Sequence, residues 1–245
     1  MSRIICWFSN GAASAYATYL AANKYGAENI TAVCCHVEEE HYSNKNFRDQ
    51  FELKTGIKVT VIKNEKYDGS IYNVFNSAKF IKGVKGAPCT SRLKKDLRKQ
   101  YQKPGDIQIF GYTIEEQNRA DRFIDANNEV EEDFILIDQE ITKKDCIDWV
   151  EKTGLPVPIM YKLGYPNNNC IGCVKGGMGY WNAIRKDFPE NFKRMAELER
   201  VIGHSVCKDK NGPVYLDELD PSRGNFERDV PGDCGFTCEA PEKNQ

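Results

Sequence analysis

The sequence predicts an α/β fold with a doubly wound parallel five-stranded sheet. Two observations predict it. Short apolar runs alternate with longer amphipathic runs over the first two thirds of the 245 residues. The apolar runs are nearly continuous and rich in β-branched residues, which is typical of strands covered on both faces. Alternating strands and helices of this kind form right-handed βαβ units with helices on both sides of the sheet.

Each element is expected where its periodicity begins and ends. The strands are expected at "RIICWF" (3–8), "ITAVCCHV" (30–37), "KVTVIK" (58–63), "DIQIFGY" (106–112) and "DFILID" (133–138). Amphipathic patterns between and after these runs predict helices near 13–24, 43–54, 70–81, 90–101, 114–126 and 142–153. These elements would together form one α/β domain over residues 1–155.

The chain changes character after Pro156, so residues 156–245 are expected to form a Cys-rich helical and loop extension packed on that domain. Pro, Gly and Asn dominate the stretch up to Gly179 and predict a loop. Two helices should follow, the second opening at Pro189. From about residue 208 onward the sequence is loop-like.

Composition restricts the function classes. The net charge of −2 argues against a broadly basic surface that coats nucleic acid. No apolar run approaches the ~20 residues that span a bilayer, and the N-terminus enters a core strand directly. We therefore expect a cytoplasmic protein without a membrane partner. Ten cysteines in that reducing compartment indicate metal or redox chemistry rather than disulfides.

A loop of small residues follows the first strand. Ser9, Asn10, Gly11, Ala12, Ala13 and Ser14 stand between "RIICWF" and the first helix. Backbone amides in such a loop, with the positive end of the helix behind them, form a cradle for phosphate or sulfate. An ordinary tight turn with a capping serine explains the same residues.

Two cysteine pairs predict a metal site. "CIGC" supplies Cys170 and Cys173, and "CGFTC" supplies Cys234 and Cys238. Four thiolates can close a tetrahedral site that suits Zn²⁺ or an iron–sulfur cluster. A redox-active dithiol is the competing interpretation.

The small-residue loop resembles the PP-loop of the adenine nucleotide α-hydrolase superfamily, in the variant found in sulfonucleotide (PAPS and APS) reductases. Ser9, Gly11, Ala12 and Ser14 match, whereas Ala13 stands where the ATP-cleaving branch has an aspartate. Three further segments match in order: "GAPCTSRLKK", "GYTIEEQNRADR" and "NCIGCVKGGMGYWNAIRKDFPENF". The last is similar to PAPS reductase-like proteins of phages and bacteria.

The resemblance implies further nucleotide-binding residues. Gly111 would lie against the nucleotide, and Arg119, with Arg122, would hold its anionic groups. Glu115 and Glu116 would orient these arginines or the ribose, and Lys175 would reach the phosphates. His36 would lie near the adenine. Solvated surface residues are the ordinary alternative for each.

The resemblance also implies roles for the thiols. Related APS reductases hold a [4Fe–4S] cluster, and a cluster in this chain would use Cys89, Cys170 and Cys173 with one of the C-terminal cysteines. Lys94 and Lys95 would favour the thiolate of Cys89. Cys89 and Cys234 are the candidate catalytic thiols, although Cys234 cannot be a metal ligand and a nucleophile at once.

Three functions follow as hypotheses. The first is a reductase that releases sulfite from PAPS or APS, with a thiol reductant such as thioredoxin. The second is a sulfurtransferase that uses ATP, with Mg²⁺, to thiolate tRNA or DNA. A nucleic-acid partner stays open, although the net charge does not indicate one. The third is a non-catalytic nucleotide-binding protein with a structural metal.

Overall fold

The computed structural model describes residues 2–83, 86–232 and 234. The chain divides into two compact units, each built from several segments. The first unit comprises Met1–His36, His41–Lys63 and Leu97–Gly164. The second comprises Val37–Glu40, Asn64–Asp96 and Tyr165–Gln245. Residues 64–96, expected in the first domain, therefore group with the Cys-rich segment.

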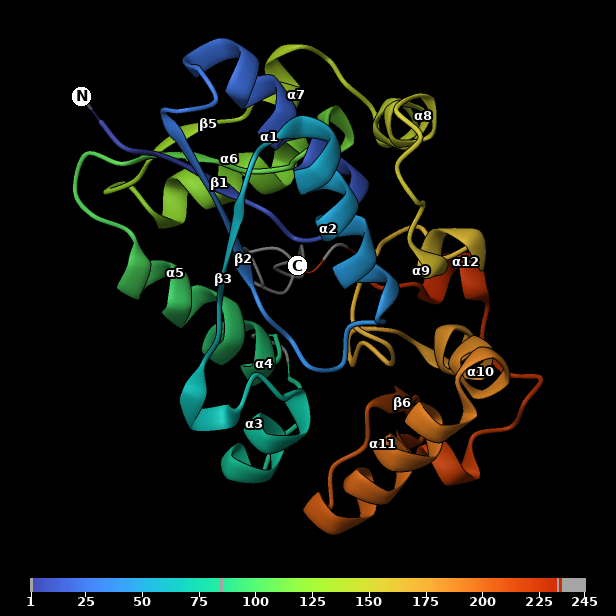
Figure 1. The fold of residues 1–245 in the computed structure, drawn as a ribbon. Helices are drawn as coiled ribbons and strands as arrows, with labels where there is room; N and C mark the ends of the chain where they lie inside the picture. The colour runs from blue at the N-terminus through green and yellow to red at the C-terminus, as the bar shows by residue number, and fades with distance from the viewer. Residues whose placement is uncertain (1, 84–85, 233, 235–245) are drawn as a thin grey trace. The chain divides into compact units, whose positions relative to one another are not determined.

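The first unit is built on a five-stranded sheet in which every pairing is parallel. The strand order is β3-β2-β1-β4-β5. The strands are β1 (Ile4–Trp7), β2 (Ile30–Cys35), β3 (Val59–Ile62), β4 (Ile107–Ile109) and β5 (Glu131–Asp133). Figure 1 labels four of them together with the helices of this unit. The predicted fold class is confirmed.

Alternate residues of β1 pack to opposite faces of the sheet. The first-unit helices are α1 (Ala12–Tyr25), α2 (Ser43–Thr55), α6 (Gln117–Ala126), α7 (Ile135–Asp138), α8 (Lys143–Lys152) and α9 (Ile159–Lys162). Cys6 and Phe8 share a buried core with the alanines of α1 and with Phe47 of α2. On the other side, the indole of Trp7 donates to Gln108 Oε1 at 2.9 Å. Both faces are covered, as the apolar strand patterns indicate.

The fifth strand differs from its prediction. Residues 135–138 form the short helix α7, and the strand is Glu131–Asp133 instead. The amides of Ile137 and Asp138 both donate to the carbonyl of Phe134, which turns the chain. A short apolar run cannot be assigned to a strand or a helix from periodicity alone, and the prediction of a strand at 134–138 is wrong.

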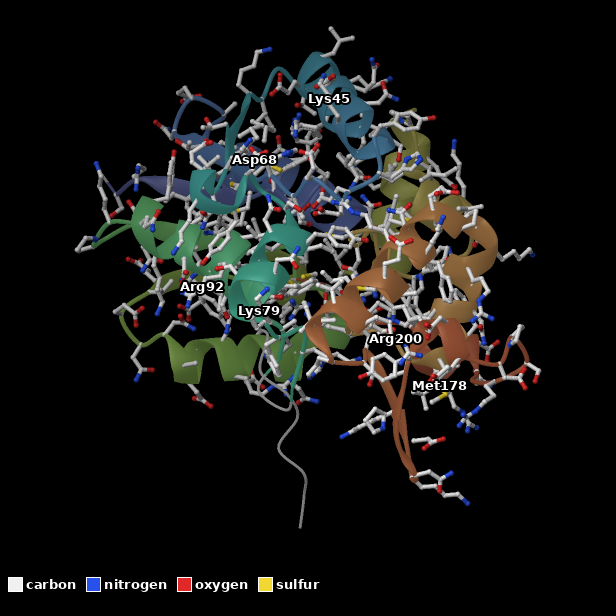
Figure 2. The ribbon with its side chains drawn as sticks, turned by 90° about the horizontal axis from the view of Figure 1, so that it is seen from below. Lys45, Asp68, Lys79, Arg92, Met178 and Arg200 are labelled. Atoms are coloured by element: carbon white, nitrogen blue, oxygen red, sulfur yellow. The ribbon has the colours of Figure 1, made fainter. Side chains whose placement is uncertain are left out.

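The second unit combines helices with a two-stranded hairpin. Its helices are α3 (Ile71–Ala78), α4 (Pro88–Thr90), α10 (Met178–Asp187), α11 (Pro189–Ile202) and α12 (Phe226–Asp229). A π-helical turn (Ser91–Lys95) continues α4 into α5 (Asp96–Tyr101). Met178 begins α10, and Arg200 lies in the last turn of α11; both are labelled in Figure 2. Pro189 opens α11 as predicted.

The stretch from residue 208 is more regular than the sequence indicates. β6 (Cys207–Asp209) pairs antiparallel with β7 (Gly212–Val214). Glu199 of α11 fixes both ends of this hairpin, since its carboxylate accepts the amides of Val206 and Leu216. The prediction of a wholly loop-like segment is therefore wrong for residues 207–214 and for α12.

Glu39 explains why a four-residue segment belongs to the second unit. Its buried carboxylate accepts from Ser70 Oγ at 2.6 Å and from the amide of Ile71 at 2.9 Å. Its carbonyl accepts the amide of Ile171 at 2.9 Å.

Among the described residues, no helix combines the length and the apolar character needed to cross a bilayer.

Candidate functional site

The loop after β1 lies where the strand order of the sheet reverses. β1 pairs with β2 on one side and with β4 on the other. Ligands of open α/β sheets bind at this position, outside the carboxyl ends of the strands. Asn10 takes a left-handed conformation, with φ of 59°, and Gly11 then caps α1 without a side-chain hydrogen bond. The chain thus turns directly from the strand into the start of the helix.

The two serines of the loop bond to each other. Ser14 Oγ accepts the Ser9 amide at 3.0 Å and donates to the Gly11 carbonyl at 3.0 Å. Ser9 Oγ donates to Ser14 Oγ at 3.1 Å. Their hydroxyls therefore hold the loop in shape.

The amides of the loop provide the donors for an anion. Ala12 donates to the hydroxyl of Tyr161 at 3.3 Å, a long hydrogen bond. Within the described part of the chain, the amides of Gly11, Ala13 and Ser14 have no acceptor. Unpaired amides in the first turn of a helix are the usual donors to phosphate and sulfate. The loop can thus bind an anionic group, with the Tyr161 hydroxyl at its edge.

Gly111 lies against this loop from the end of β4. A Cβ atom on Gly111 would lie 2.6 Å from the Ser14 nitrogen and 2.7 Å from its Cα. These separations are far below van der Waals contact, so only glycine allows the two loops to meet. Gly111, expected beside the nucleotide, contacts the backbone that forms the anion loop.

Arg119 is held in place, whereas Arg122 is not. Arg119 Nη1 forms an ion pair with Glu116 Oε1 at 2.6 Å, and its guanidinium lies 4.6 Å from the centre of the Tyr112 ring. Arg122 is exposed and donates to the carbonyl of Asn118. The prediction that Glu116 orients an arginine agrees with this geometry. Glu115 instead accepts the amide of Lys143 at the start of α8, at 3.1 Å.

His36 lies where the strand pattern places it. Its amide donates to the carbonyl of Ile62 at 2.8 Å, directly after β2, and its side chain is half-buried. It thus follows the carboxyl end of a strand next to β1.

Three of the predicted metal ligands are buried in the second unit. Cys170, Cys173 and Cys234 are buried, with 7%, 7% and 8% of their surface exposed. They are close enough that the charge of Cys234 would raise the pKa of both other thiols. Asn169 Oδ1 accepts the amide of Cys234 at 2.9 Å, and the Tyr180 hydroxyl accepts the amide of Cys173 at 2.8 Å.

Lysines partly offset the burial of these thiols. Lys94, itself buried, donates from Nζ to the carbonyl of Cys234 at 3.0 Å. Burial raises the pKa of Cys170 well above its usual value and that of Cys173 to about 11. Lys94 opposes both shifts, and Lys175 opposes that of Cys173. Burial thus favours the protonated form of Cys170 and Cys173.

These residues offer the donor types of a thiolate metal site. Three sulfur atoms near two ammonium groups suit the negative charge of a zinc or iron–sulfur thiolate centre. Among the described residues, no three His, Cys, Asp or Glu side chains are already arranged around a metal position. Cys238 lies outside the described residues. Cys89, on α4, is half-buried in the same unit.

Comparisons with known proteins add no family assignment. No protein-family model matches the chain, and no curated protein matches it. The resemblance to sulfonucleotide reductases therefore rests on the motifs of this sequence, and the function is argued from the geometry of its residues.

Several site residues were missed at the sequence level. Thr90 Oγ1 lies 3.6 Å from Cys234 Sγ, and Asn169, Tyr180 and Tyr161 bond the backbone of the candidate sites. Asn169 directly precedes the Cys170 pair, which is the one local signal that could have indicated it. The others contact their sites through the fold alone. Lys94, expected beside Cys89, instead bonds the backbone of Cys234.

Proposed function

We propose that this chain is a PAPS reductase-like enzyme of the cytoplasm. It binds an adenine nucleotide at the Ser9–Ser14 loop and releases sulfite from a sulfonucleotide with a cysteine thiol. The observation that carries the proposal is the set of unpaired amides of Gly11, Ala13 and Ser14 at the strand-order reversal. Such a set binds the anionic end of a nucleotide without a metal ion.

The first turn of α1 favours a sulfonucleotide over ATP. It contains no acidic residue, and Ala13 occupies the position of the aspartate in ATP-cleaving relatives. A carboxylate at that point would be needed to hold Mg²⁺ beside a triphosphate. The sulfurtransferase that uses ATP with Mg²⁺ is therefore the weaker proposal.

Cys89 is the stronger candidate for the nucleophile. It is half-buried, so substrate and reductant can reach it, and it stands in the first turn of a helix that continues to Tyr101. The positive end of a helix favours negative charge there. Cys234 is buried, and its amide and carbonyl are both bonded, to Asn169 and Lys94. A fixed, buried thiol suits a metal ligand better.

The reaction balances with one external dithiol. The Cys89 thiolate attacks the sulfonate sulfur, an S–S bond forms, and the S–O bond to the nucleotide breaks. Its electron pair leaves with the nucleoside phosphate. A thiolate of a dithiol reductant such as thioredoxin then attacks Cys89 Sγ, which forms a mixed disulfide and expels sulfite. The second thiolate of the reductant attacks its own sulfur in the mixed disulfide, so the Cys89 thiolate is released and the reductant becomes a disulfide. The loop amides stabilise the negative charge of the departing phosphate.

A zinc ion or [4Fe–4S] cluster would be held by Cys170, Cys173 and Cys234, with Cys238 as the fourth predicted thiolate. When bound, it fixes these thiolates and adds positive charge. Lys94 opposes the rise in the pKa of both Cys170 and Cys173, and Lys175 opposes that of Cys173. The metal assignment can be checked on anaerobically purified protein by metal analysis and by the visible absorption of iron–sulfur centres.

The test is a nucleotide panel. Anaerobic protein is incubated with PAPS, APS or ATP and a dithiol, and sulfite, nucleoside phosphate and pyrophosphate are measured. We expect sulfite with PAPS or APS and no sulfite from the Cys89→Ser variant. The control variant Ser91→Ala, two residues further along the chain, should still produce it. Pyrophosphate from ATP without sulfite would favour the sulfurtransferase. Nucleotide binding without turnover would favour the non-catalytic protein.

A further inference from the structure

A large cavity lies within the second unit. Its volume is about 1070 Å³, and its wall is formed by the segments around Lys82, Lys175–Met178, Gly203–Asp209 and Arg223–Asp229. All of these segments belong to the same unit. Small-molecule sites commonly enclose ~300–1,000 Å³. The cavity is therefore large enough for a nucleotide-sized ligand, and it does not include the Ser9–Ser14 loop.

The wall of the cavity is positively charged. Five cationic side chains line it and two carboxylates do, an excess of three positive charges. The five cationic residues are Lys82, Lys175, Lys208, Arg223 and Arg228. The chain as a whole carries a net charge of −2, so this wall departs from the average surface. An anionic ligand would neutralise the excess charge.

Both carboxylates of the wall already have partners. Asp209 forms an ion pair with Arg223 at 2.8 Å. Asp229 Oδ2 accepts the amides of Gly179 at 2.7 Å and Asn225 at 2.9 Å, and so caps the start of α10. Among the described residues, Lys208 and Arg228 form no ion pair. Their charges remain available to a ligand.

Lys82 contributes a partly desolvated ammonium to the same wall. Its Nζ lies 3.4 Å from the carbonyl of Gly176, and burial lowers its pKa. A buried ammonium is stabilised by an anion that enters beside it. A ligand phosphate near Lys82 would therefore stabilise its ammonium by forming an ion pair with it.

The wall also offers an apolar surface and an unpaired polar atom. Phe80 is 38% exposed, and its ring meets the edge of His204, with centroids 4.8 Å apart. His204 Nδ1 is buried and has no hydrogen-bond partner within the described part of the chain. Exposed aromatic rings stack on planar ligand groups, and an unpaired ring nitrogen can bond a polar atom of one.

We propose that this cavity is a second ligand site, which binds a phosphorylated small molecule with a planar ring. Lys82, Lys208 and Arg228 hold the phosphate, and Phe80 with His204 contacts the ring. A cavity of this volume with local positive charge favours a small ligand over a nucleic acid, whose backbone follows an extended basic groove. The site is separate from the anion loop of the first unit and does not depend on the activity proposed for that loop.

The experiment uses the full chain and residue-specific labelling of lysines by acetic anhydride, read by mass spectrometry. AMP should protect Lys82 and Lys208 several-fold, whereas Lys186 and Lys193, outside the cavity, should stay unchanged. Adenosine, which lacks the phosphate, should protect neither cavity lysine. Equal protection by adenosine, or no protection by AMP, would overturn the proposal.

A binding measurement supplies the second arm. In calorimetric titrations of AMP, Lys208→Gln/Arg228→Gln should remove one class of site or weaken it about tenfold or more. Lys186→Gln/Lys193→Gln is the matched control and should bind as the wild type does. In Gly111→Ala, which disturbs only the first-unit loop, lysine protection should persist. Protection that disappears in Gly111→Ala would assign the effect to the loop and refute the second site. A polynucleotide that protects these lysines more strongly than AMP would also refute the small-ligand assignment.

Discussion

Gly111 shows how a single absent methyl group can determine a binding loop. The loop after β4 meets the first turn of α1 so closely that a Cβ would lie 2.6 Å from a backbone nitrogen. Neither partner is a flexible side-chain end, so the contact cannot be relieved cheaply. The resemblance implies that this glycine lies against the nucleotide. In the structure, its missing side chain allows the loop after β4 to approach the loop after β1.

Gly111→Ala should therefore damage both stability and nucleotide binding. We expect a loss of about 1–3 kcal/mol, typical of overpacked sites, measured by urea unfolding. AMP binding at the loop should weaken in calorimetry because the amides of Ala13 and Ser14 must shift. Gly232→Ala is the control, since no atom of the described residues lies within 4 Å of its added Cβ. Equal stability of the two variants would contradict this explanation.

The thiols of the second unit should differ in reactivity with pH. Burial raises the pKa of Cys173 to about 11, so in metal-free protein its thiolate fraction, and its alkylation by iodoacetamide, should rise about tenfold per pH unit from pH 7 to 10. The half-buried Cys89 should react first at pH 7. If Cys173 reacted as fast as Cys89 at pH 7 in metal-free protein, its pKa would not be raised as stated. Mass spectrometry after timed quenching gives the rates.

At this scale the sequence predicts residue types better than contacts. The cysteine spacing identifies Cys170 and Cys173, and the structure places them with Cys234. Sequence order suggests Lys94 as a neighbour of Cys89, yet its ammonium bonds the backbone of a residue 140 positions away. Contacts of that range depend on the whole fold, and no local pattern encodes them.

The β6–β7 hairpin depends on one carboxylate from a neighbouring helix. Glu199 of α11 is fully buried and accepts two backbone amides, which flank the hairpin. Burial raises its pKa to about 7, although the two amides oppose this shift. The hairpin therefore carries a titrating group at its base.

Glu199 should make stability decrease as pH rises. A raised carboxyl pKa means that the folded state holds the proton more tightly than the unfolded state does. Its contribution is therefore full below pH 4.5 and is lost as the pH rises to 7, by at most about 1.4 kcal/mol per unit. Urea unfolding of the wild type and Glu199→Gln across this range tests it. The variant should lack this part of the slope; identical slopes would contradict the assignment.

Element prediction succeeds where periodicity is long and fails where it is short. The 14-residue helices α1 and α11 follow patterns of several turns and lie where expected. The run Phe134–Asp138 is too short to show a period, and its hydrogen bonds form a helical turn. The hairpin was not predicted because β6 and β7 have only three residues each. It is also held by hydrogen bonds to Glu199 of α11, which the sequence pattern of the strands does not reveal.

The whole molecule consists of two units that each have their own buried core. The first encloses the sheet, and the second encloses the thiol cluster together with α10 and α11. The residues expected to bind an anion therefore lie in the first unit, and the thiols lie in the second. The interleaved segments of the units were not foreseeable, because domain prediction from sequence assumes continuous stretches.

Metal removal should affect one unit selectively. Chelation would remove the metal proposed for Cys170, Cys173 and Cys234, so amide hydrogen exchange should accelerate in residues 165–202 and near Thr90. The amides of β1 and β2 should keep their protection, since their partners lie in the sheet. A uniform loss of protection across both units, measured by mass spectrometry, would show that the metal is not confined to the second unit.

The interleaving of segments has a consequence for synthesis of the chain. Residues 37–40 and 64–96 leave the ribosome early, yet their partners in the second unit begin only at Tyr165. Chain emerging N-terminus first can complete the sheet after Gly164, while Thr90 and Lys94 still lack Cys234, which they contact in the folded protein. For most of its elongation a nascent polypeptide therefore carries only part of the thiol site, and the metal proposed there could bind only after residue 234 has emerged.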